Sequence, residues 1–330
     1  MRCMTIHAVR IHSYGGPEVL RWETVDVPEP GQGQARIRHT AIGLNFIDTY
    51  ERTGLYPLQL PAVLGREAAG VVEAVGPGVN QLKAGDRIAY AFNSSGAYSE
   101  ARVLPAERLV RIPEGVDDKQ AAALMLKGMT AQMLLRQTYR VRKGNTLLVH
   151  AAVGGVGSIL VQWAKHLGAK VIAVVGSTAK AERARELGAD HVVLSSEDWV
   201  AQTKAAAGNK GVDVVYDSVG KDTFMGSLDC LRPRGLMVTY GNASGPVPPI
   251  APLELSKRGS LFLTRPTLFH YIPTRATLVR AASEMFDLVA KSVITVHVGQ
   301  TYPLQEAARA HVDLEARRTI GATILLPNGQ

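Results

Sequence analysis

A short glycine-rich segment near the middle of the chain has the composition of a phosphate-binding turn. Its glycines are Gly154, Gly155 and Gly157, with Val156 between them. They follow an apolar run at residues 146–149, which is typical of a buried parallel strand, and precede an amphipathic helical stretch. Glycine lets the backbone approach a pyrophosphate, and the first amides of the following helix can donate to it. The turn therefore predicts a site for a nicotinamide or flavin dinucleotide.

The segments around this turn favour a cofactor site over a turn that only packs. Ala152 stands where the usual motif has its first glycine, so the motif by itself is weak evidence. However, apolar runs at residues 171–175 and 212–216 follow as further strands, and a helical stretch at 179–187 lies between them. Two strand–helix–strand units in succession are typical of a dinucleotide-binding sheet.

The residues after the second of these strands favour NADPH over NADH. An acidic residue about 20 positions after the glycine turn would bind the ribose hydroxyls of NAD. This chain has Gly176, Ser177 and Lys180 there, and no carboxylate to repel a 2′-phosphate. Lys180 offers a charge suited to phosphate, whereas Arg183 and Arg185 are better explained as part of a solvated basic helix face. We therefore predict NADPH as the cofactor.

The composition is that of an ordinary globular enzyme. The 330 residues are enough for two domains, and 46% of them are hydrophobic. The net charge of +8 comes from scattered basic residues, which favours a basic surface and a polyanionic cofactor over nucleic-acid binding. Two cysteines, Cys3 and Cys230, exclude a disulfide framework, and no apolar run is long enough to span a membrane. Since the first residues lack the core of a signal peptide, we expect a cytoplasmic protein.

Two patterns of secondary structure divide the chain. Up to about residue 126, alternating strands punctuated by proline and glycine are expected. These strands are 35–42, 70–75, 86–90 and 98–103. After a helical stretch at 119–137, helices alternate with strands, which suits a doubly wound sheet of six strands. These later strands begin at Thr146, Lys170, His191, Val212, Gly235 and Ser260.

The last segment is predicted to complete the first part. It is expected to contain a helix at 275–291, a strand at 295–299, a short helix at 304–313 and a strand at 321–326. The simplest architecture is α/β, with a Rossmann domain at residues 127–265 inserted into a β-rich domain. That β-rich domain would be formed by residues 1–126 and 266–330.

Segments spread in order along the whole chain resemble one known family, the zinc-independent quinone oxidoreductases of the medium-chain dehydrogenase/reductase superfamily (the zeta-crystallin-like group). The segments are 14–20, 42–48, 54–57, 65–70, 85–90, 127–130, 151–157, 215–220, 241–242 and 263–266. The resemblance implies a GroES-like catalytic domain around the Rossmann domain, and NADPH as the cofactor. It also implies a homodimer, commonly formed through edge strands such as residues 260–264.

The resemblance further implies roles for single residues. Asn45 and Tyr50 would lie near the nicotinamide and the substrate, with Tyr56 at the mouth of the cleft. The other cofactor contacts would be Thr130, Gly154, Gly155, Val156, Gly157, Gly176, Ser177, Lys180, Ser218, Gly241, Asn242, Leu263, Thr264 and Arg317. Zinc-dependent relatives have a cysteine and a histidine where this chain has Asn45 and Arg66, so no metal is expected.

These residues favour the reduction of a quinone by NADPH without a metal. A quinone accepts a hydride readily, so the protein needs mainly to stack donor and acceptor in the interdomain cleft. Asn45 and Tyr50 could hydrogen-bond the developing oxyanion, and Tyr56 could form a stacking wall. On sequence grounds, packing alone explains each tyrosine equally well.

Two other functions stay open at this stage. Reduction of the carbon–carbon double bond of an enone or alkenal by NADPH has nearly the same requirements. A non-catalytic protein that binds NADPH and has a structural or RNA-binding role is the other alternative. The full set of cofactor residues and the lack of a basic stripe speak against the second.

Overall fold

The computed structural model describes residues 3–327, and these form two compact units. The first unit holds the chain up to Met129, then Ile272–Ala290, and the chain from Val296 onward. The second unit holds Thr130–Tyr271 and Lys291–Thr295. Among the described residues, no helix is both long and apolar enough to cross a membrane. The domain borders expected at 126/127 and 265/266 stay a prediction.

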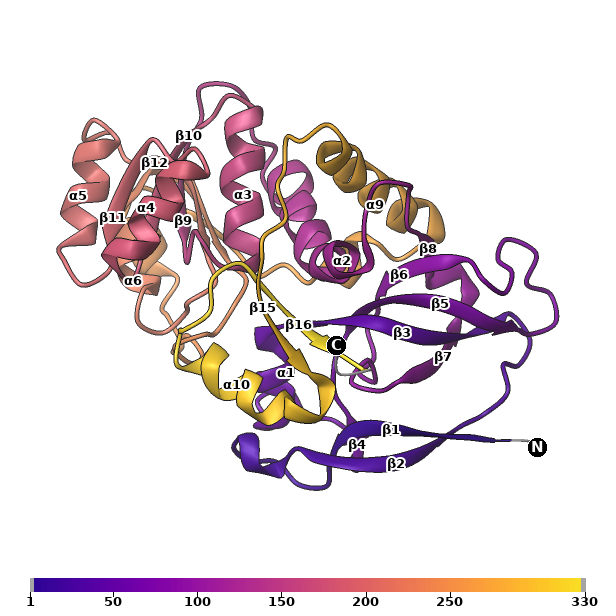
Figure 1. Ribbon diagram of the computed structural model, residues 1–330. Helices are drawn as coiled ribbons and strands as arrows, with labels where there is room; N and C mark the ends of the chain where they lie inside the picture. Colours follow the sequence, from indigo (N-terminus) through magenta and orange to yellow (C-terminus); the bar gives the residue numbers. More distant parts are fainter. Residues whose placement is uncertain (1–2, 328–330) are drawn as a thin grey trace. The chain divides into compact units, whose positions relative to one another are not determined.

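The second unit is built on a six-stranded sheet in which every neighbouring pair is parallel (Figure 1). Its strands are β9 (Thr146–His150), β10 (Lys170–Val175), β11 (His191–Leu194), β12 (Val212–Asp217), β13 (Leu231–Thr239) and β14 (Phe262–Thr264). Their order is β11-β10-β9-β12-β13-β14, so the strand order reverses between β9 and β12. This confirms the predicted doubly wound sheet. The apolar runs are nearly continuous because helices cover both faces of such a sheet.

Helices connect these strands. They are α3 (Gly155–His166), α4 (Thr178–Glu186), α5 (Trp199–Ala206), α6 (Phe224–Asp229), α7 (Leu253–Lys257) and α8 (Leu268–Tyr271). Helix α3 buries an apolar face with Ile159, Leu160 and Trp163, as its spacing predicts. Helices α4 and α5 begin at side-chain caps, Ser177 and Asp198. The core beneath them is formed mainly by Val, Leu and Ile side chains from the strands.

The first unit contains two sheets. The smaller sheet has the order β2-β1-β4, from β1 (Met4–Ile11), β2 (Arg21–Val27) and β4 (Ala62–Val63). The larger sheet has seven strands: β3 (Gln34–Leu44), β5 (Glu67–Val75), β6 (Arg87–Ala91), β7 (Ala101–Pro105), β8 (Val110–Arg111), β15 (Val298–Pro303) and β16 (Ala322–Leu326). Strand β16 pairs with β3, with Ile324 opposite Gly43, so segments from the N-terminal and C-terminal parts of the chain share one sheet (Figure 1).

Four longer segments pack with these sheets. They are α1 (Phe46–Arg52), α2 (Asp118–Gln132), α9 (Arg275–Ala290) and α10 (Ala307–Glu315). Helix α9 fits the predicted helix at 275–291. Helix α2 ends earlier than the predicted stretch at 119–137, because the chain continues as a π-helix at Met133–Thr138.

Several boundaries differ from the sequence predictions. Strand β13 begins at Leu231 rather than at Gly235, and β14 begins at Phe262 rather than at Ser260. The strand expected at 98–103 is β7, and it begins only at Ala101, where pairing with β3 becomes possible. The strand expected at 295–299 is β15, which begins at Val298, where its partner β16 is within reach. The helix expected at 304–313 is a 3₁₀ turn followed by α10. Helix α1 was not predicted, because its buried residues are mostly charged or polar rather than apolar.

Candidate active site

Most of the predicted cofactor residues lie at one edge of the six-stranded sheet. The glycine turn follows β9, Gly176 follows β10, Ser218 follows β12 and Gly241 follows β13. Because the strands are parallel, their carboxyl ends meet at the same edge. In open sheets of this kind, ligands bind at that edge where the strand order reverses, which here lies between β9 and β12.

The glycine turn has the backbone geometry that a pyrophosphate requires. Gly154 is the N-cap of α3 and makes no side-chain cap, so the first amides of the helix face outward from the turn. A Cβ at Gly157 would lie 2.2 Å from the carbonyl oxygen of Ala151, so only glycine lets α3 approach the end of β9 this closely. A helix N-terminus with free amides is a suitable site for anionic phosphates.

The segment after β10 fits the phosphate on the adenosine ribose. The Ser177 hydroxyl caps α4 and accepts a hydrogen bond from the Lys180 backbone amide at 3.4 Å. Gly176 and Ser177 are exposed, and no acidic residue lies between them and Lys180. The edge therefore carries small, polar and basic groups where a 2′-phosphate would lie.

The loops after β12 and β13 lie in direct contact. A Cβ at Gly241 would come within 2.3 Å of the carbonyl oxygen of Ser218. Arg265 holds this arrangement from the end of β14, since its Nη1 donates to the Gly241 carbonyl at 2.9 Å and to the Thr239 hydroxyl at 3.1 Å. Arg265 had no predicted role, although it follows directly after the predicted contact Thr264.

Other predicted cofactor residues have more varied positions. Asn242 continues the loop after β13, and Leu263 and Thr264 lie in β14 opposite Met237 and Val238. Thr130 lies near the end of α2, at the start of the second unit. Arg317 lies just after α10 in the first unit, with a positive φ of 59°. The roles of these residues stay predictions.

Asn45 is held in a buried polar cluster of the first unit. Its side-chain amide donates to the Glu67 carboxylate at 2.9 Å and to the Gly43 carbonyl at 3.3 Å. Glu67 is also paired with the buried Lys127 ammonium, and its other oxygen accepts the Leu126 amide at 2.6 Å. Both hydrogens of the Asn45 amide are therefore already engaged, which leaves this side chain no hydrogen to donate to a ligand.

The two predicted tyrosines pack against each other. The rings of Tyr50 and Tyr56 meet edge to face, with centroids 5.4 Å apart and an interplanar angle of 73°. The Tyr56 amide also donates to the Tyr50 carbonyl at 3.1 Å, so the chain after α1 folds back on the helix. Tyr50 is buried and also contacts Phe46. Of the predicted catalytic residues, Tyr50 and Tyr56 thus contact each other, and Asn45 is the N-cap of the helix that carries Tyr50.

A hydrogen-bonded chain beneath α1 was not predicted. The Tyr98 hydroxyl lies 2.9 Å from the Asp48 Oδ2 atom and 3.0 Å from the His311 Nε2 atom. His311 Nδ1 is 3.0 Å from the Arg52 guanidinium, which also forms two hydrogen bonds to Glu315. Burial raises the pKa of Asp48 to about 7 and lowers the pKa of His311 to about 3. These residues are far apart in sequence, so no local pattern could have indicated the chain.

A second buried network supports the cofactor edge of the sheet. Asp217, the last residue of β12, accepts hydrogen bonds from the hydroxyls of Thr223 at 2.7 Å and Ser227 at 3.0 Å, and from the Val219 amide at 2.8 Å. His150, the last residue of β9, lies 2.9 Å from the Ser227 hydroxyl. Burial lowers the His150 pKa, which favours the neutral ring.

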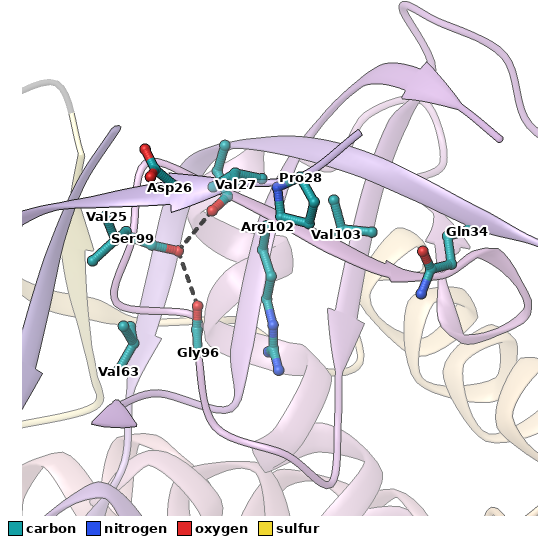
Figure 2. A pocket seen from close by; sticks show the side chains of 11 residues that line it. Val25, Asp26, Val27, Pro28, Gln34, Val63, Gly96, Ser99, Arg102 and Val103 are labelled. Carbon is teal, nitrogen blue, oxygen red and sulfur yellow. Dashed lines mark hydrogen bonds between the residues drawn. The ribbon is translucent and has the colours of Figure 1, made fainter. Parts of the chain in front are cut away.

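A surface hollow of about 330 Å³ lies elsewhere in the first unit (Figure 2). Val25, Val27, Val103 and Arg102 line it, and the Ser99 hydroxyl lies 2.9 Å from the Gly96 carbonyl oxygen at its edge. None of the predicted site residues belongs to the described residues that line this hollow. Its lining is largely apolar, with Asp26 and Ser99 among its few polar side chains.

Comparison with known proteins shows the family to which the chain belongs. Residues 31–114 match the alcohol dehydrogenase GroES-like domain, and residues 155–291 match the zinc-binding dehydrogenase family. A quinone oxidoreductase from Pseudomonas aeruginosa is 52% identical, and the match covers 97% of this chain and 99% of that protein. The chain belongs to the quinone oxidoreductase family of the medium-chain dehydrogenase/reductase superfamily.

Other members of this superfamily match equally well in sequence and structure. The Escherichia coli quinone oxidoreductase, whose crystal structure is a complex with NADPH, has a TM-score of 0.95 and 48% identity, covering 98% of this chain and all of that one. A 2-haloacrylate reductase from a Burkholderia species is 50% identical, over 98% of this chain and 99% of that protein. The family is therefore associated with more than one kind of acceptor.

The side chains at the zinc-ligand positions of the superfamily do not fit a zinc ion. Arg66 donates from Nε to the Glu51 carboxylate at 2.7 Å, and a guanidinium cannot coordinate a metal. Asn45 directs its NH₂ group to Glu67, which is itself paired with Lys127. Across residues 3–327, no group of three or more His, Cys, Asp or Glu side chains is arranged to hold a metal ion.

Proposed function

We propose that the chain reduces quinones with NADPH. The observation that carries the proposal is the glycine turn at the point where the strand order reverses, together with a neighbouring strand end that has a lysine and no acid. The relatives named quinone oxidoreductase match nearly the full length of the chain and support the choice of acceptor.

The cofactor would lie along the carboxyl edge of the six-stranded sheet. Amides of the first turn of α3 would donate to the pyrophosphate, and the segment after β10 would bind the 2′-phosphate. The residues proposed to hold NADPH are Asn45, Thr130, Gly154, Gly155, Val156, Gly157, Gly176, Ser177, Lys180, Ser218, Gly241, Asn242, Leu263, Thr264 and Arg317. The close approach at Gly157 and the absence of an acid between the end of β10 and Lys180 are the features that fit this ligand.

When bound, NADPH supplies a hydride to the acceptor. The protein's own contribution is to orient the acceptor and to stabilise the charge that develops on it. The edge-to-face pair of Tyr50 and Tyr56 would form an aromatic wall for a flat ring, and the Tyr50 hydroxyl would hydrogen-bond the reduced oxygen. Asn45 would hold the Tyr50 segment through Glu67 rather than donate to the oxyanion, because both its amide hydrogens are engaged.

Reduction of an activated carbon–carbon double bond is the second candidate. It is favoured by the match to the 2-haloacrylate reductase over nearly the whole chain. A quinone and a conjugated alkene place similar demands on the site, since each accepts hydride on carbon and charge on oxygen. The choice between the two depends on the shape of the acceptor site.

The assembly and cellular setting are proposed by analogy with the family. A homodimer would form through residues 260–264, because β14 is an edge strand with Phe262 56% exposed and Leu263 38% exposed. The enzyme would work without a metal and in the cytoplasm. Residues 1–126 with 266–330 would form the catalytic domain, and residues 127–265 the NADPH-binding domain.

Steady-state oxidation of NADPH tests the proposed function. The acceptors are 1,4-benzoquinone, 9,10-phenanthrenequinone, a short alkenal and 2-chloroacrylate, each measured with NADPH and with NADH. We expect saturable turnover of a quinone with a preference for NADPH. Turnover of only the alkene substrates would replace the proposal by the second candidate. Tight NADPH binding without turnover of any acceptor would favour a non-catalytic, RNA-binding or structural role.

A further inference from the structure

Helix α1 buries three charged side chains, although it is only seven residues long. Asp48 and Glu51 are fully buried, and Arg52 is 1% exposed. Charged groups are buried in this way only when partners compensate the lost hydration. The same short helix begins after Asn45 and carries Tyr50, so its placement determines the position of the proposed acceptor site.

Three ion pairs balance nearly all the charges around this helix. Glu51 pairs with Arg66, Arg52 pairs with Glu315, and Glu67 pairs with Lys127. Asp48 is the exception, because none of the described residues forms an ion pair with it. An ionised Asp48 would therefore add one uncompensated negative charge to a cluster that is otherwise neutral.

The hydrogen bonds to Asp48 can be assigned unambiguously. The Arg52 guanidinium can only donate, so His311 Nδ1 accepts and its Nε2 carries the hydrogen. His311 then donates to the Tyr98 oxygen, and Tyr98 donates to Asp48 Oδ2. The Asn45 backbone amide donates to the same oxygen at 2.9 Å.

The other oxygen of Asp48 has no hydrogen-bond partner. The Oδ1 atom is buried, and none of the described side chains or backbone groups bonds to it. A buried carboxylate with one unsolvated, unbonded oxygen is costly, whereas a proton on that oxygen removes the charge. The geometry therefore favours the neutral acid at this position.

The groups around Asp48 have opposing effects on its pKa. Burial and the neighbouring Glu51 raise its pKa, while the hydrogen bonds from Asn45 and Tyr98 and the charge of Lys127 lower it, with a result of about 7. His311, on α10, is neutral because burial and Arg52 lower its pKa to about 3. Of the two residues Asp48 and His311, Asp48 is therefore the one that changes charge near neutral pH.

We propose that Asp48 is a positioning residue that acts through Asn45 and α1, and that its neutral form is the working form of the enzyme. Asp48 fixes the Asn45 backbone amide at the start of α1, next to the residues proposed to contact the acceptor. Reduction of the acceptor adds negative charge until a proton follows, and an unpaired negative charge on Asp48 opposes this. The effect of Asp48 on catalysis rests on the proposed function, whereas the ionisation of Asp48 near neutral pH does not depend on it.

The ionisation of the Asp48 carboxyl can be followed through the chemical shift of the Asn45 backbone amide, measured by NMR on protein with ¹⁵N-labelled asparagine. The chain has seven asparagines, so the spectrum is simple, and loss of one peak in Asn45→Gln assigns the signal. We expect the Asn45 amide proton to shift with a midpoint near pH 7 as Asp48 ionises. The shift should be absent in Asp48→Asn. In Tyr98→Phe, which loses a donor to the carboxylate, the midpoint should move to higher pH.

The effect of Asp48 ionisation on catalysis is measured as the pH dependence of kcat for quinone reduction. We expect kcat of the natural chain to fall roughly thirtyfold as the pH rises from 6 to 8.5, and Asp48→Asn to keep an almost flat profile. The KM for NADPH should change little, because the proposed phosphate contacts belong to the second unit. Asp198→Asn is the matched control, since Asp198 caps α5 with an exposed carboxylate.

The outcomes separate the two proposals. An Asn45 amide that does not titrate between pH 5 and 9 overturns the role of Asp48, whatever the activity. An amide that titrates, with equal pH profiles for the natural chain and Asp48→Asn, also overturns it as a positioning residue. If Asp48→Asn does not fold, an unchanged midpoint and pH profile in Tyr98→Phe overturns it. Absence of any quinone turnover, with the titration intact, instead counts against the proposed function.

Discussion

The backbone at Gly157 lies against the carbonyl oxygen of Ala151, so closely that a Cβ there would stand 2.2 Å from that oxygen. Ala151 has a positive φ of 48° and turns the chain out of β9. The contact therefore fixes the first turn of α3 at the carboxyl end of the strand. This is the geometry that would aim the amides of the helix at a pyrophosphate.

Gly157→Ala is expected to disturb this turn. Overpacking of this kind costs about 1–3 kcal/mol of stability and would move the first turn of α3, so the Kd for NADPH should rise. Gly31→Ala is the control, because Gly31 has no proposed cofactor role and its Cβ would lie 3.1 Å from the flexible Gln34 side chain, which can shift at little cost. Fluorescence titration with NADPH and thermal unfolding measure both effects. Equal NADPH affinity in the two variants would contradict the assignment of the turn.

Lys180→Ala is expected to weaken NADPH binding and leave NADH binding nearly unchanged. A charged hydrogen bond to phosphate is worth about 1.5–3 kcal/mol, which corresponds to roughly a tenfold to hundredfold change in Kd. Arg183→Ala is the control, since Arg183 forms a surface ion pair with Glu186. Calorimetric titration of each variant with NADPH and with NADH gives the change in Kd for each cofactor. Equal losses for NADPH and NADH would remove Lys180 from the 2′-phosphate site.

Arg52→Met is expected to destabilise the first unit strongly. The guanidinium is buried, and its removal leaves His311 and Glu315 without their shared donor. Because the Glu315 side chain is 36% exposed, the expected cost is that of leaving the buried His311 without its donor, about 1–3 kcal/mol. Arg309→Ala is the control. Arg309 lies on α10, the helix that also carries Glu315, and its surface ion pair with Glu306 should contribute less than about 1 kcal/mol. Chemical denaturation of both variants measures the difference, and similar midpoints would refute the argument.

The Asp48 carboxyl should also affect stability in a pH-dependent way. Its pKa rises from 3.8 in the unfolded chain to about 7 in the folded one, so the folded state binds more protons between these values. The Asp48 contribution to the free energy of unfolding therefore falls as pH rises from about 4 to 7, by at most about 1.4 kcal/mol per pH unit.

Buried histidines have the opposite effect on the pH dependence of the free energy of unfolding over part of this pH range. The pKa values of His39 and His311 are lowered from 6.5 to about 4 and about 3, so their contributions increase as pH rises. The difference between the natural chain and Asp48→Asn isolates the Asp48 effect, because both share the histidines. Urea denaturation at pH 5, 6, 7 and 8 should give a difference that declines to a plateau above pH 7. A constant difference would mean that Asp48 is ionised throughout.

Phe262→Glu is expected to convert the proposed homodimer to monomers. Phe262 lies in the edge strand β14 and is exposed in the single chain, and a charge there would disfavour pairing between two edges. Met225→Glu on α6 is the control, since Met225 is a similarly exposed apolar residue of the same unit. Sedimentation velocity distinguishes the species. A natural chain that sediments as a monomer would exclude this interface.

The sequence by itself determined the nucleotide-binding unit to a large extent. Its parallel strands are buried on both faces, so they are continuous apolar runs, and the glycine turn between β9 and α3 is a local feature. The absence of an acid after β10 is equally local. Strand order and the edge where the loops meet then follow from the regular handedness of strand–helix–strand connections.

Only the tertiary structure decided the surroundings of α1. A helix with Asp48, Glu51 and Arg52 has the sequence of an exposed segment, because charged residues are rarely buried. Their partners, such as Tyr98 and His311, lie in distant segments that meet only when both ends of the chain join one unit. The protonation state of a carboxyl depends on the solvent and charges that surround it in three dimensions, and residue type and spacing do not specify these.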